Sequence, residues 1–454
     1  MTVHHLHFMG IGGVGMCGLA EVLHSQGHTV SGCDLSDSER TRYLQGLGIA
    51  VASGHDPSHL DDVDAIVMSS AVAPDEAELA AARERGLVVA RRAEMLAELM
   101  RMQRGVAVAG THGKTTTTAL IGHILSAAGE DPTVIVGGRS HGLGSHARVG
   151  SGSLLVCEAD EFDRSFLELA PQISVITNLE PEHLDCYGDQ ETLEAAFAAF
   201  ANRTSVFGAV VMCADDAGAL ELRGSLRRRV LTYGTSADAD LRLQIVASDA
   251  GGTHINVSRG REELGQAHVA LPGAHNALNA GAAILVGLEL GVDFEILAAA
   301  CSSFTGVARR FEVLGERRGV TVVDDYAHHP TEIAAVLDAT RQAMPGRRVV
   351  AVFQPHLFSR TREFARDFAA ALLGAEVAVV LPIYPARERP IDGVTAQLVV
   401  DEAERLGHPR VLTGPAPEEA FPELDEILEP GDVLLTLGAG DVDRVGSLWL
   451  EVAS

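Results

Sequence analysis

The chain has 454 residues, 46% of them hydrophobic, and this length corresponds to about three domains of ~150 residues. Its 62 acidic and 35 basic residues give a net charge of −27, which argues against a nucleic acid or an anionic membrane as the main partner. The six cysteines form no Cys-x-x-Cys pair, and no signal peptide or apolar run of about 18 residues is recognised, so we predict a cytoplasmic protein without a membrane-inserted segment.

Short apolar runs alternate with helical patterns along the chain, which is typical of parallel α/β sheets. In the first block the apolar runs span residues 4–9, 65–68 and 87–89. A helical stretch over residues 93–102 then leads to a new strand over residues 106–109. We therefore expect the first domain to end at residue 103.

A glycine-rich motif follows the first predicted strand. Residues 10–15 read Gly-Ile-Gly-Gly-Val-Gly, and Asp34 ends the next predicted strand, 19 residues after Gly15. Such glycines allow a tight turn and the close approach of a pyrophosphate, and an acidic residue at this spacing binds a ribose hydroxyl. The motif alone does not choose between a dinucleotide, a uridine diphosphate sugar and a turn without a ligand.

The second glycine motif contains the only lysine of the chain, against 34 arginines. Residues 110–118 read Gly-Thr-His-Gly-Lys-Thr-Thr-Thr-Thr, with the lysine at position 114. The first glycine is two residues closer to the lysine than in the usual P-loop, but the elements of a phosphate site are present. Backbone amides surround phosphates, a compact ammonium reaches them, and the hydroxyl of Thr115 is a ligand for Mg²⁺.

Polar side chains follow the next predicted strands of this block. Glu158 follows the apolar run 154–156 after one intervening residue, and His183 lies in the segment after the run 173–176. A carboxylate and an imidazole at these strand ends predict metal ligands. Residues 241–270 show alternating hydrophobicity around a Gly-Gly turn, which predicts inserted antiparallel strands.

A Pro-Gly-x-His-Asn-x-x-Asn segment at residues 272–279 precedes an apolar helix. Asn276 is either a helix cap or, with Asn279, one of two amides able to bind a purine. A hinge at residues 309–312 then opens the third block, whose strands we predict at 320–323, 349–353, 377–381, 411–412 and 433–437.

Four motifs occur in an order that resembles the Mur ligases of peptidoglycan synthesis. They are Gly-Thr-His-Gly-Lys-Thr-Thr, Glu-Ala-Asp-Glu, Asn-x-Glu-x-x-His-x-Asp and Pro-Gly-x-His-Asn-x-x-Asn. The start Gly-Ile-Gly-Gly-Val-Gly-Met, the segment Asp-Tyr-Ala-His-His-Pro-Thr-Glu at 325–332 and Phe-Gln-Pro-His at 353–356 narrow the resemblance to members that add L-alanine.

The resemblance implies an α/β fold of three domains and an ATP-dependent ligase. The expected domains are an N-terminal Rossmann-like domain (1–103), a central P-loop ATPase-like domain with a mixed sheet (104–308) and a C-terminal Rossmann-like domain (309–454). The expected reaction joins L-alanine to the lactyl carboxylate of UDP-N-acetylmuramate through an acyl phosphate, with Mg²⁺ and with release of ADP and phosphate. It would serve cell wall formation, and hence cell shape and division.

The resemblance also carries site residues over to this chain. It assigns the UDP sugar to Gly10, Ile11, Gly12, Gly13, Val14, Gly15, Asp34, Ser69 and Ser70. It assigns ATP to Gly110, Thr111, His112, Gly113, Lys114, Thr115, Thr116, His275, Asn276, Asn279, Arg310, Asp324 and Asp325. The implied metal ligands are Thr115, Glu158 and His183, and the implied amino-acid site contains Tyr326, His328, His356 and Arg360.

The implied catalytic residues are Lys114, His183, Arg310 and His328, with the general base left open between the two histidines. One departure is visible. Many members have an arginine after Phe-Gln-Pro-His, whereas this chain has Leu357, so the cationic role falls on Arg360 or Arg362.

Several alternatives stay open at this point. Within the class they are a murein peptide recycling ligase, which accepts a tripeptide, a later Mur ligase and a folylpolyglutamate synthase, which lacks the first domain. From other classes they are an NAD-dependent oxidoreductase, which leaves Lys114 unexplained, and a non-catalytic nucleotide-binding regulator. The oligomeric state, monomer or homodimer, and the use of L-serine or glycine are also open.

Overall fold

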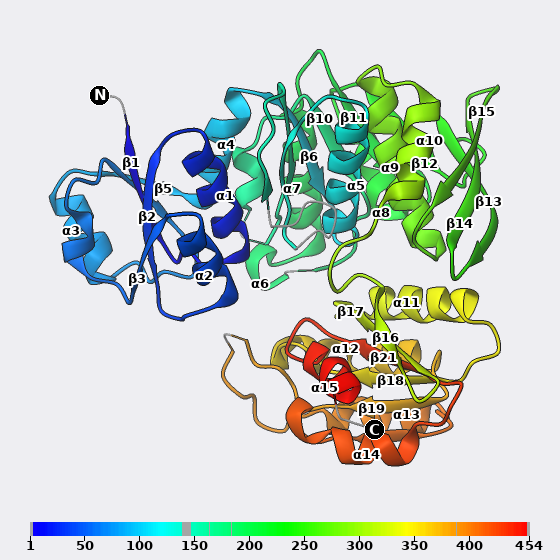
Figure 1. The fold of residues 1–454 in the computed structure, drawn as a ribbon. Coiled ribbons are helices and arrows are strands. Elements are labelled where there is room, and N and C mark those ends of the chain that lie inside the picture. Colours follow the sequence, from blue (N-terminus) through cyan, green and yellow to red (C-terminus); the bar gives the residue numbers. More distant parts are fainter. Residues whose placement is uncertain (1–2, 139–146, 163, 183, 387, 452–454) are drawn as a thin grey trace. The chain divides into compact units, whose positions relative to one another are not determined.

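The computed structural model describes residues 3–138, 147–162, 164–182, 184–386 and 388–451 (Figure 1). The chain folds into two compact units. Unit 1 comprises Met1–Gln244, Asn256–Ala267 and Leu278–Thr305, and unit 2 comprises Ile245–Ile255, His268–Ala277 and Gly306–Ser454. The division does not fall at residues 103 and 308, so the predicted domain boundaries stay predictions. Among the described residues, no helix is both long and apolar enough to cross a membrane.

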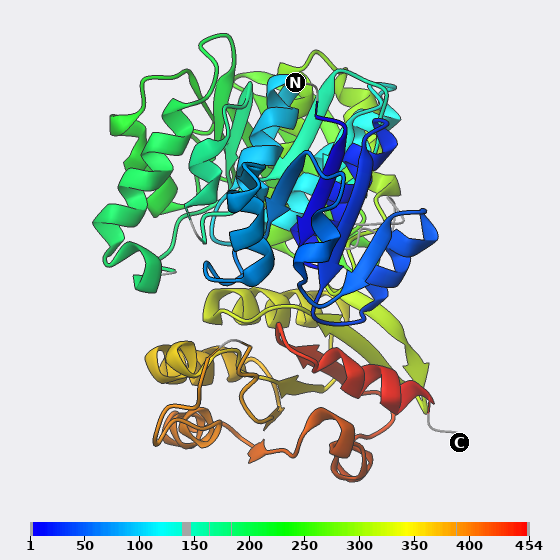
Figure 2. The same cartoon turned by 90° about the vertical axis from the view of Figure 1, so that its left-hand side faces the viewer.

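The first sheet has the order β3-β2-β1-β4-β5, and each pairing described is parallel. Its strands are β1 (His5–Met9), β2 (Thr29–Asp34), β3 (Ala50–Ser53), β4 (Ala65–Met68) and β5 (Val88–Arg91). Its helices are α1 (Val14–Ser25), α2 (Glu39–Gly46), η1 (Pro57–Leu60), α3 (Ala77–Glu84) and α4 (Arg92–Arg101). The strands lie side by side in both ribbon views (Figure 1, Figure 2).

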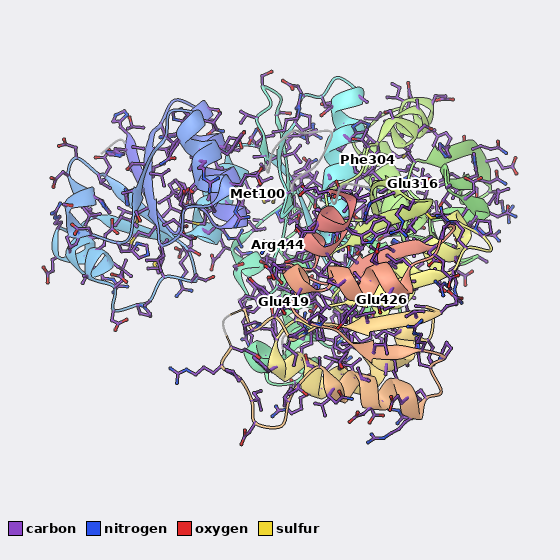
Figure 3. All side chains as sticks on the ribbon, turned by 60° about the horizontal axis from the view of Figure 1, so that its bottom comes forward. Met100, Phe304, Glu316, Glu419, Glu426 and Arg444 are labelled. Atoms are coloured by element: carbon purple, nitrogen blue, oxygen red, sulfur yellow. The ribbon has the colours of Figure 1, made fainter. Side chains whose placement is uncertain are left out.

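Helices cover both faces of this sheet. Leu6 and Phe8 pack with residues of α1 and α4 on one face, whereas Met9 packs with residues of η1 and α3 on the other. Alternate residues of β1 therefore serve two cores, as expected for a parallel strand buried on both sides. Met100 of α4, labelled in Figure 3, lies so close to Gly105 that a Cβ there would be 2.5 Å from its Cγ.

The second sheet has the order β15-β14-β13-β12-β11-β10-β6-β9-β7-β8. Its strands are β6 (Arg104–Ala109), β7 (Thr133–Ile135), β8 (Ala147–Arg148), β9 (Leu154–Glu158), β10 (Ile173–Ile176), β11 (Ala209–Cys213), β12 (Val230–Gly234), β13 (Leu241–Asp249), β14 (Gly252–Arg259) and β15 (Glu262–Val269). Two-residue connections join the last three strands, which requires antiparallel hairpins, as predicted. The helices are α5 (Lys114–Ala127), η2 (Ser165–Glu168), α6 (Leu184–Tyr187), α7 (Gln190–Asn202), α8 (Ala217–Glu221), η3 (Leu222–Ser225), α9 (Ala274–Glu289) and α10 (Phe294–Ser303).

The parallel part of this sheet brings the predicted site residues to one edge. β6 lies between β10 and β9, and Ala109 pairs with Ile176 while Val108 pairs with Glu158. The carboxyl ends of the three strands therefore meet, which is where parallel α/β sheets bind ligands.

The third sheet has the order β16-β17-β21-β18-β19-β20. Its strands are β16 (Glu312–Arg317), β17 (Val320–Asp325), β18 (Val349–Phe353), β19 (Val377–Val380), β20 (Val411–Thr413) and β21 (Val433–Leu437), and β16 is antiparallel to β17. Its helices are α11 (Pro330–Ala343), α12 (Phe358–Leu372), α13 (Gln397–Arg405), η4 (Pro417–Glu419), α14 (Phe421–Ile427) and α15 (Asp443–Glu451). Residues of α11, α12 and α13 build the core on one face, and residues of α14 and α15 build it on the other.

Candidate active site

The first part of the second glycine motif, residues 110–113, forms a loop between β6 and α5 that requires its glycines. Gly110 has φ 137° and Gly113 has φ 79°. A Cβ at Gly110 would lie 2.0 Å from Thr177 Oγ1, and one at Gly113 would lie 2.6 Å from Asn279 Oδ1. Since the loop ends at the first turn of α5, the unpaired amides of that turn are available to an anion.

Lys114, the first residue of α5, follows this loop, and its side chain has three hydrogen-bond acceptors. Its Nζ donates to the carbonyl oxygens of Gly110 (2.6 Å) and Thr111 (3.1 Å) and to Glu161 Oε1 (2.7 Å). Glu161 stands in the acidic Glu-Ala-Asp-Glu segment after β9, where the motif alone gave it no role. Glu161 is therefore the ion-pair partner of the single lysine.

Three carboxylates keep this partly buried ammonium charged. Burial alone would lower the pKa of Lys114, but Glu161, Glu182 and Asp160 outweigh burial and raise it above its usual value. Lys114 is therefore a permanent cation at neutral pH. The protonated ammonium is the form of lysine that binds phosphate oxygens.

Glu158 and Thr115, two of the three predicted metal ligands, lie together. Glu158 accepts hydrogen bonds from the Thr115 hydroxyl and from the backbone N–H of Gly137. Burial raises the pKa of Glu158, and the Gly137 N–H and Lys114 offset only part of that rise. Carboxylate and hydroxyl oxygens are donors that a hard cation such as Mg²⁺ prefers. The third predicted ligand, His183, lies outside the described residues.

The segment after β10 supports the phosphate loop from the side. The N–H of His112 donates to Asn178 Oδ1 (2.7 Å), and the N–H of Glu180 donates to Thr111 Oγ1 (2.9 Å). His112 Nε2 is also 3.5 Å from Glu180 Oε2. These contacts fix the loop, while Thr116 is buried in α5, so its side chain belongs to the helix interior.

The two asparagines predicted to bind adenine lie in α9, and each has an identified hydrogen-bond partner. Asn279 Oδ1 accepts a hydrogen bond from Thr117 Oγ1 (3.1 Å), which ties α9 to α5. Asn276 Nδ2 donates to the carbonyl oxygen of Pro272 (2.8 Å). Both residues thus have structural contacts, and their role toward a purine stays a prediction.

The first glycine loop, between β1 and α1, is fixed by Asp34. The N–H of Gly12 donates to Asp34 Oδ2 (2.9 Å), and the N–H of Ser36 donates to Asp34 Oδ1 (3.1 Å). Arg40 donates to the Gly12 carbonyl oxygen. Asp34 therefore organises the loop, and binding a ribose hydroxyl would be an additional role.

Not all of the predicted UDP-sugar residues present their side chains to a ligand. Ile11 is fully buried in the core, and its N–H donates to the carbonyl oxygen of Cys33 (3.1 Å). Ser69, after β4, lies against Gly10, where a Cβ would be 3.0 Å from Ser69 Cβ. Ser70 is exposed, and the side chain of Val14 is not among those described. Within this predicted set, Ile11 is therefore a core residue, unlike the loop positions around it.

In unit 2, Asp324, the last residue but one of β17, is held by two side chains. Asp324 accepts from Arg309 Nε (2.9 Å) and from Thr436 Oγ1 (2.5 Å) and is almost fully buried. Arg309 has a left-handed backbone with φ 59° and also donates to the carbonyl oxygens of Gly438 and Gly440. The sequence did not single out Arg309, whose role here is to fix the end of the sheet.

Asp325 is a second buried carboxylate at this strand end. It accepts from the N–H groups of Phe311 (2.7 Å) and Ala327 (2.8 Å). Burial raises the pKa of Asp325 to about 7, although Arg310 and the Phe311 N–H act in the opposite direction. Both aspartates predicted to bind ATP therefore have structural partners in this unit.

Aromatic rings predicted to bind the amino acid form a row in unit 2. The Tyr326 ring centroid is 5.3 Å from Arg310 Cζ and 5.4 Å from the His328 ring. His328 lies edge-on to His356 at 5.9 Å, and His356 stacks on Tyr384 at 5.8 Å. Tyr384 was not predicted, because it lies 58 residues from Tyr326 in the sequence and no motif includes it.

Glu332 lies between Arg310 and His328 beside this row. Its Oε1 is 3.7 Å from Arg310 Nη1 and its Oε2 is 3.3 Å from His328 Nδ1. His275 lies nearby in the same unit. Burial lowers the pKa of His275 to about 4; Glu332 partly opposes this and Arg310 adds to it. The sequence indication for Glu332 is its position as the third residue of a helix that starts with Pro330, which is typical of a capping box.

Arg360 and Leu357 lie at the start of α12. The backbone of Leu357 has φ 69°, and its N–H donates to the Tyr384 carbonyl oxygen (2.9 Å). Arg360 is 9% exposed within the first turn of the helix. Of the two cations predicted to replace the missing arginine, Arg360 is therefore buried and Arg362 is exposed.

Three family models match the chain in sequence order. They are described as the Mur ligase family, catalytic domain (residues 5–104), the Mur ligase middle domain (108–287) and the Mur ligase, glutamate ligase domain (309–440). The chain belongs to the Mur ligase family. The resemblance seen in the motifs and the predicted α/β fold class are both confirmed.

Individual relatives agree over the whole length. UDP-N-acetylmuramate–L-alanine ligases from Sorangium cellulosum and Salinibacter ruber are 49% and 46% identical, covering 97% and 99% of this chain and 94% and 95% of the relative. The crystal structure of a UDP-N-acetylmuramate–alanine ligase from Thermotoga maritima is 30% identical with a TM-score of 0.83, covering 98% of both chains. A murein peptide ligase from Psychrobacter arcticus shares the fold at 23% identity, with a TM-score of 0.72 over 99% of this chain and 100% of that one.

Proposed function

We propose that this protein is the ligase that joins L-alanine to the lactyl carboxylate of UDP-N-acetylmuramate, using ATP. The observation that carries the proposal is the single lysine, held in a phosphate-binding loop beside Glu161. The chain also matches UDP-N-acetylmuramate–L-alanine ligases along almost its full length. A Mur ligase of this kind acts in the cytoplasm in peptidoglycan precursor synthesis, and that location stays a prediction.

The first chemical step activates the carboxylate. One of its oxygens attacks the γ-phosphorus of ATP, the bond from that phosphorus to the bridging oxygen breaks, and ADP leaves an acyl phosphate behind. Charge grows on the phosphoryl oxygens during this transfer. Lys114, which its carboxylate neighbours keep cationic, is the side chain we propose to stabilise that charge.

A metal ion fits beside the lysine. The adjacent Thr115 hydroxyl and the buried Glu158 carboxylate are oxygen donors, the set expected for Mg²⁺ and not for a softer metal. We propose that these two residues hold it, with His183 as the third predicted ligand. Bound there, Mg²⁺ would supply neutralisation of phosphate charge.

The second step forms the amide. The amine nitrogen of L-alanine attacks the acyl carbon, the carbon–oxygen bond to the phosphoryl group breaks, and inorganic phosphate leaves. A base must take one proton from the nitrogen. His328 suits this role, because its Nδ1 lies 3.0 Å from the Tyr326 carbonyl oxygen, which only accepts. The proton then sits on Nδ1, and Nε2 carries the lone pair.

Arg310 and the aromatic row around Tyr326 are proposed to receive the amino acid. Arg310 is 3.7 Å from Glu332 and stacks on the Tyr326 ring, so its guanidinium is oriented in advance. An oriented guanidinium binds a carboxylate through two parallel hydrogen bonds. The buried Arg360 is the second cation assigned to this task.

Two rival functions make different demands. An NAD-dependent oxidoreductase would use the loop at 10–15 and would leave Lys114 and Glu161 without a purpose. A recycling ligase would use the same phosphate loop and differ in the acceptor, a tripeptide instead of L-alanine. The 45–49% identity to alanine ligases favours the amino acid.

Phosphate release from ATP and Mg²⁺ in the presence of UDP-N-acetylmuramate tests the proposal. We expect release that requires L-alanine, with a product heavier by one alanine residue in mass spectrometry. Release only with L-Ala-γ-D-Glu-containing tripeptide would identify a recycling ligase. No release with either acceptor, together with NAD binding, would refute the proposed ligase.

A further inference from the structure

The first domain contains a buried group of metal-binding side chains that the proposed ligase does not use. We call it the Glu78 cluster; its members are His7, Cys33, His55, His59 and Glu78. They come from β1, β2, the segment before η1, η1 and α3. Four separate parts of the sequence thus meet at the Glu78 carboxylate.

The distances within the cluster are short. Glu78 Oε1 is 3.0 Å from His7 Nε2 and 3.2 Å from His59 Nδ1. Glu78 Oε2 is 3.3 Å from Cys33 Sγ and 3.4 Å from His55 Nδ1. Cys33 Sγ is in turn 3.0 Å from His55 Nδ1. One ligand atom from each of His7, Cys33, His59 and Glu78 lies within 4.8 Å of the others.

The cluster interrupts an otherwise apolar layer. The same face of the first sheet packs Met9, Ile66 and Leu79 with residues of η1. Glu78 is fully buried there, and His7 is 2% exposed. Burying a carboxylate and several imidazoles is costly unless they bind one another or a metal. His59, 19% exposed, leaves one side open to solvent, which gives an ion an entry path.

His7 is also oriented as a metal ligand would be. Its Nδ1 lies 2.9 Å from Ser31 Oγ, and that hydroxyl lies 2.8 Å from His5 Nε2. The hydrogen bond at Nδ1 turns Nε2 toward Glu78. Histidines that ligate metals generally have their second ring nitrogen held in this way.

We propose that the Glu78 cluster binds one divalent transition metal ion of the zinc class through Cys33 Sγ, His7 Nε2, His59 Nδ1 and a Glu78 oxygen. A mixed sulfur, nitrogen and oxygen set suits Zn²⁺ and disfavours Mg²⁺ or Ca²⁺. Ligand bonds of about 2.0–2.3 Å in a tetrahedron place donors about 3.5 Å apart, close to the separations present. Binding releases the Cys33 thiol proton to solvent.

The position of Cys33 gives the metal a structural consequence. The carbonyl oxygen of Cys33 accepts hydrogen bonds from the N–H groups of Gly10 and Ile11, and the next residue is Asp34. A metal bond to the Cys33 side chain would therefore brace the strand end that carries the first glycine loop. The site is separate from the Thr115 and Glu158 donors, which contain no sulfur or nitrogen.

Cobalt titration of the reduced, chelator-treated full chain tests the proposal. Co²⁺ bonded to a thiolate shows an ultraviolet charge-transfer absorption that Co²⁺ at an oxygen site lacks. We expect this absorption to saturate at about one ion per chain and to disappear when Zn²⁺ is added. Metal content after gel filtration with Zn²⁺ provides the second readout.

Variants connect the absorption to the cluster. Cys33→Ser should remove it, and His59→Gln should weaken Co²⁺ binding at least about tenfold, with folding checked by circular dichroism. Cys186→Ser, which removes an exposed thiol, should change nothing. His59→Gln keeps the test decisive if Cys33→Ser does not fold, since His59 is the least buried of the four ligands. An unchanged titration in a folded variant of either residue, or no thiolate absorption in the native protein, would overturn the proposal.

Discussion

The two glycine loops of unit 1 have the same placement and different chemistry. Each follows a parallel strand and leads into a helix, at residues 10–13 before α1 and at 110–113 before α5. The first loop is fixed by a carboxylate, through the hydrogen bond from Gly12 N–H to Asp34. The second contains an ammonium, Lys114, which contacts two carbonyl groups of its own loop and Glu161.

This difference separates binding from catalysis. Backbone amides at a helix start bind phosphate in its resting state and contribute affinity. Only a charge that strengthens its contact as the phosphoryl group transfers accelerates the reaction. We therefore propose that the first loop contributes binding and that the second combines binding with stabilisation of the transition state.

Removing the lysine gives the largest expected effect. Lys114→Ala should lower kcat by at least about 10²–10³-fold, because one preorganised cation at the developing charge is lost. Lys114→Arg should be severely impaired as well, since a planar guanidinium is wider than the ammonium that the loop surrounds. Phosphate release measures the loss.

Calorimetry of the same variants tests the comparison itself. UDP-N-acetylmuramate should bind to Lys114→Ala as it does to the native protein, because the first loop is intact. The matched control is Arg101→Ala, which removes an exposed cation paired with Glu98 and should turn over normally. Retained turnover in Lys114→Ala would show that the second loop is not catalytic.

Replacing a glycine by alanine should impair turnover in the second loop and UDP-sugar binding in the first. At Gly110, φ 137° and a Cβ 2.0 Å from Thr177 Oγ1 forbid the substitution without movement of the loop. Gly110→Ala should therefore lower turnover about 100-fold and leave UDP-sugar affinity unchanged. At Gly12 the new Cβ meets only side-chain atoms, of Asp34 and Thr41, at 2.9 Å. Gly12→Ala should weaken UDP-sugar binding about tenfold with ATP affinity unchanged.

Gly46→Ala is the control for both variants, because no atom lies within 4 Å of its new Cβ. It should be indistinguishable from the native protein in turnover and in both affinities. If Gly12→Ala instead reduced ATP affinity, the division of labour between the loops would be wrong.

Local patterns in the sequence were sufficient for the strands and loops that bear these sites. The run predicted at 65–68 is β4, and the helix predicted at 93–102 is α4, shifted by one residue. These elements are readable because buried parallel strands are continuous apolar runs and glycine loops have a fixed spacing. The antiparallel strand β16 was not predicted, because its burial pattern lacks a regular period.

Partnerships between distant residues were not predictable in the same way. Lys114 and Glu161 are 47 residues apart, and their contact depends on β6 and β9 being neighbours in the sheet. Ile11 stands inside the glycine motif, yet its side chain is in the core. A motif gives the spacing of the loop, but sheet order and the direction of each side chain decide which residues meet.

Two partly buried basic groups, Lys114 and His275, extend the comparison to the pH dependence of stability. Carboxylates around Lys114 raise its pKa, whereas burial lowers the pKa of His275 from 6.5 to about 4. At His275, the unfolded chain therefore binds more protons than the folded one between these two pKa values, and the contribution of His275 to stability falls as pH decreases through that window. Between about pH 7.5 and about pH 5 the loss through His275 should be about 2 kcal/mol, whereas Asp325, whose pKa burial raises to about 7, changes stability in the opposite direction.

His275→Gln should reduce this loss. Urea unfolding followed by the fluorescence of Trp449, the only tryptophan and a residue of the same unit, measures it at the two pH values. His254→Gln, at an exposed position in that unit, is the control and should keep the native pH dependence. Equal pH dependence in native protein and His275→Gln would show that His275 is not buried in its neutral form.

The smallest effect is expected where a carboxylate only organises a loop. Asp34 uses one oxygen for Gly12 N–H and the other for Ser36 N–H. Asn has a single acceptor oxygen, so Asp34→Asn must lose one of the two bonds, worth about 1 kcal/mol. UDP-sugar affinity measured by calorimetry should fall about fivefold, with kcat at saturation unchanged. Asp37→Asn, an exposed neighbour paired with Arg42, should leave the affinity as it is. A large fall in kcat for Asp34→Asn would mean that the first loop also takes part in the chemistry, and the contrast between the two loops would no longer hold.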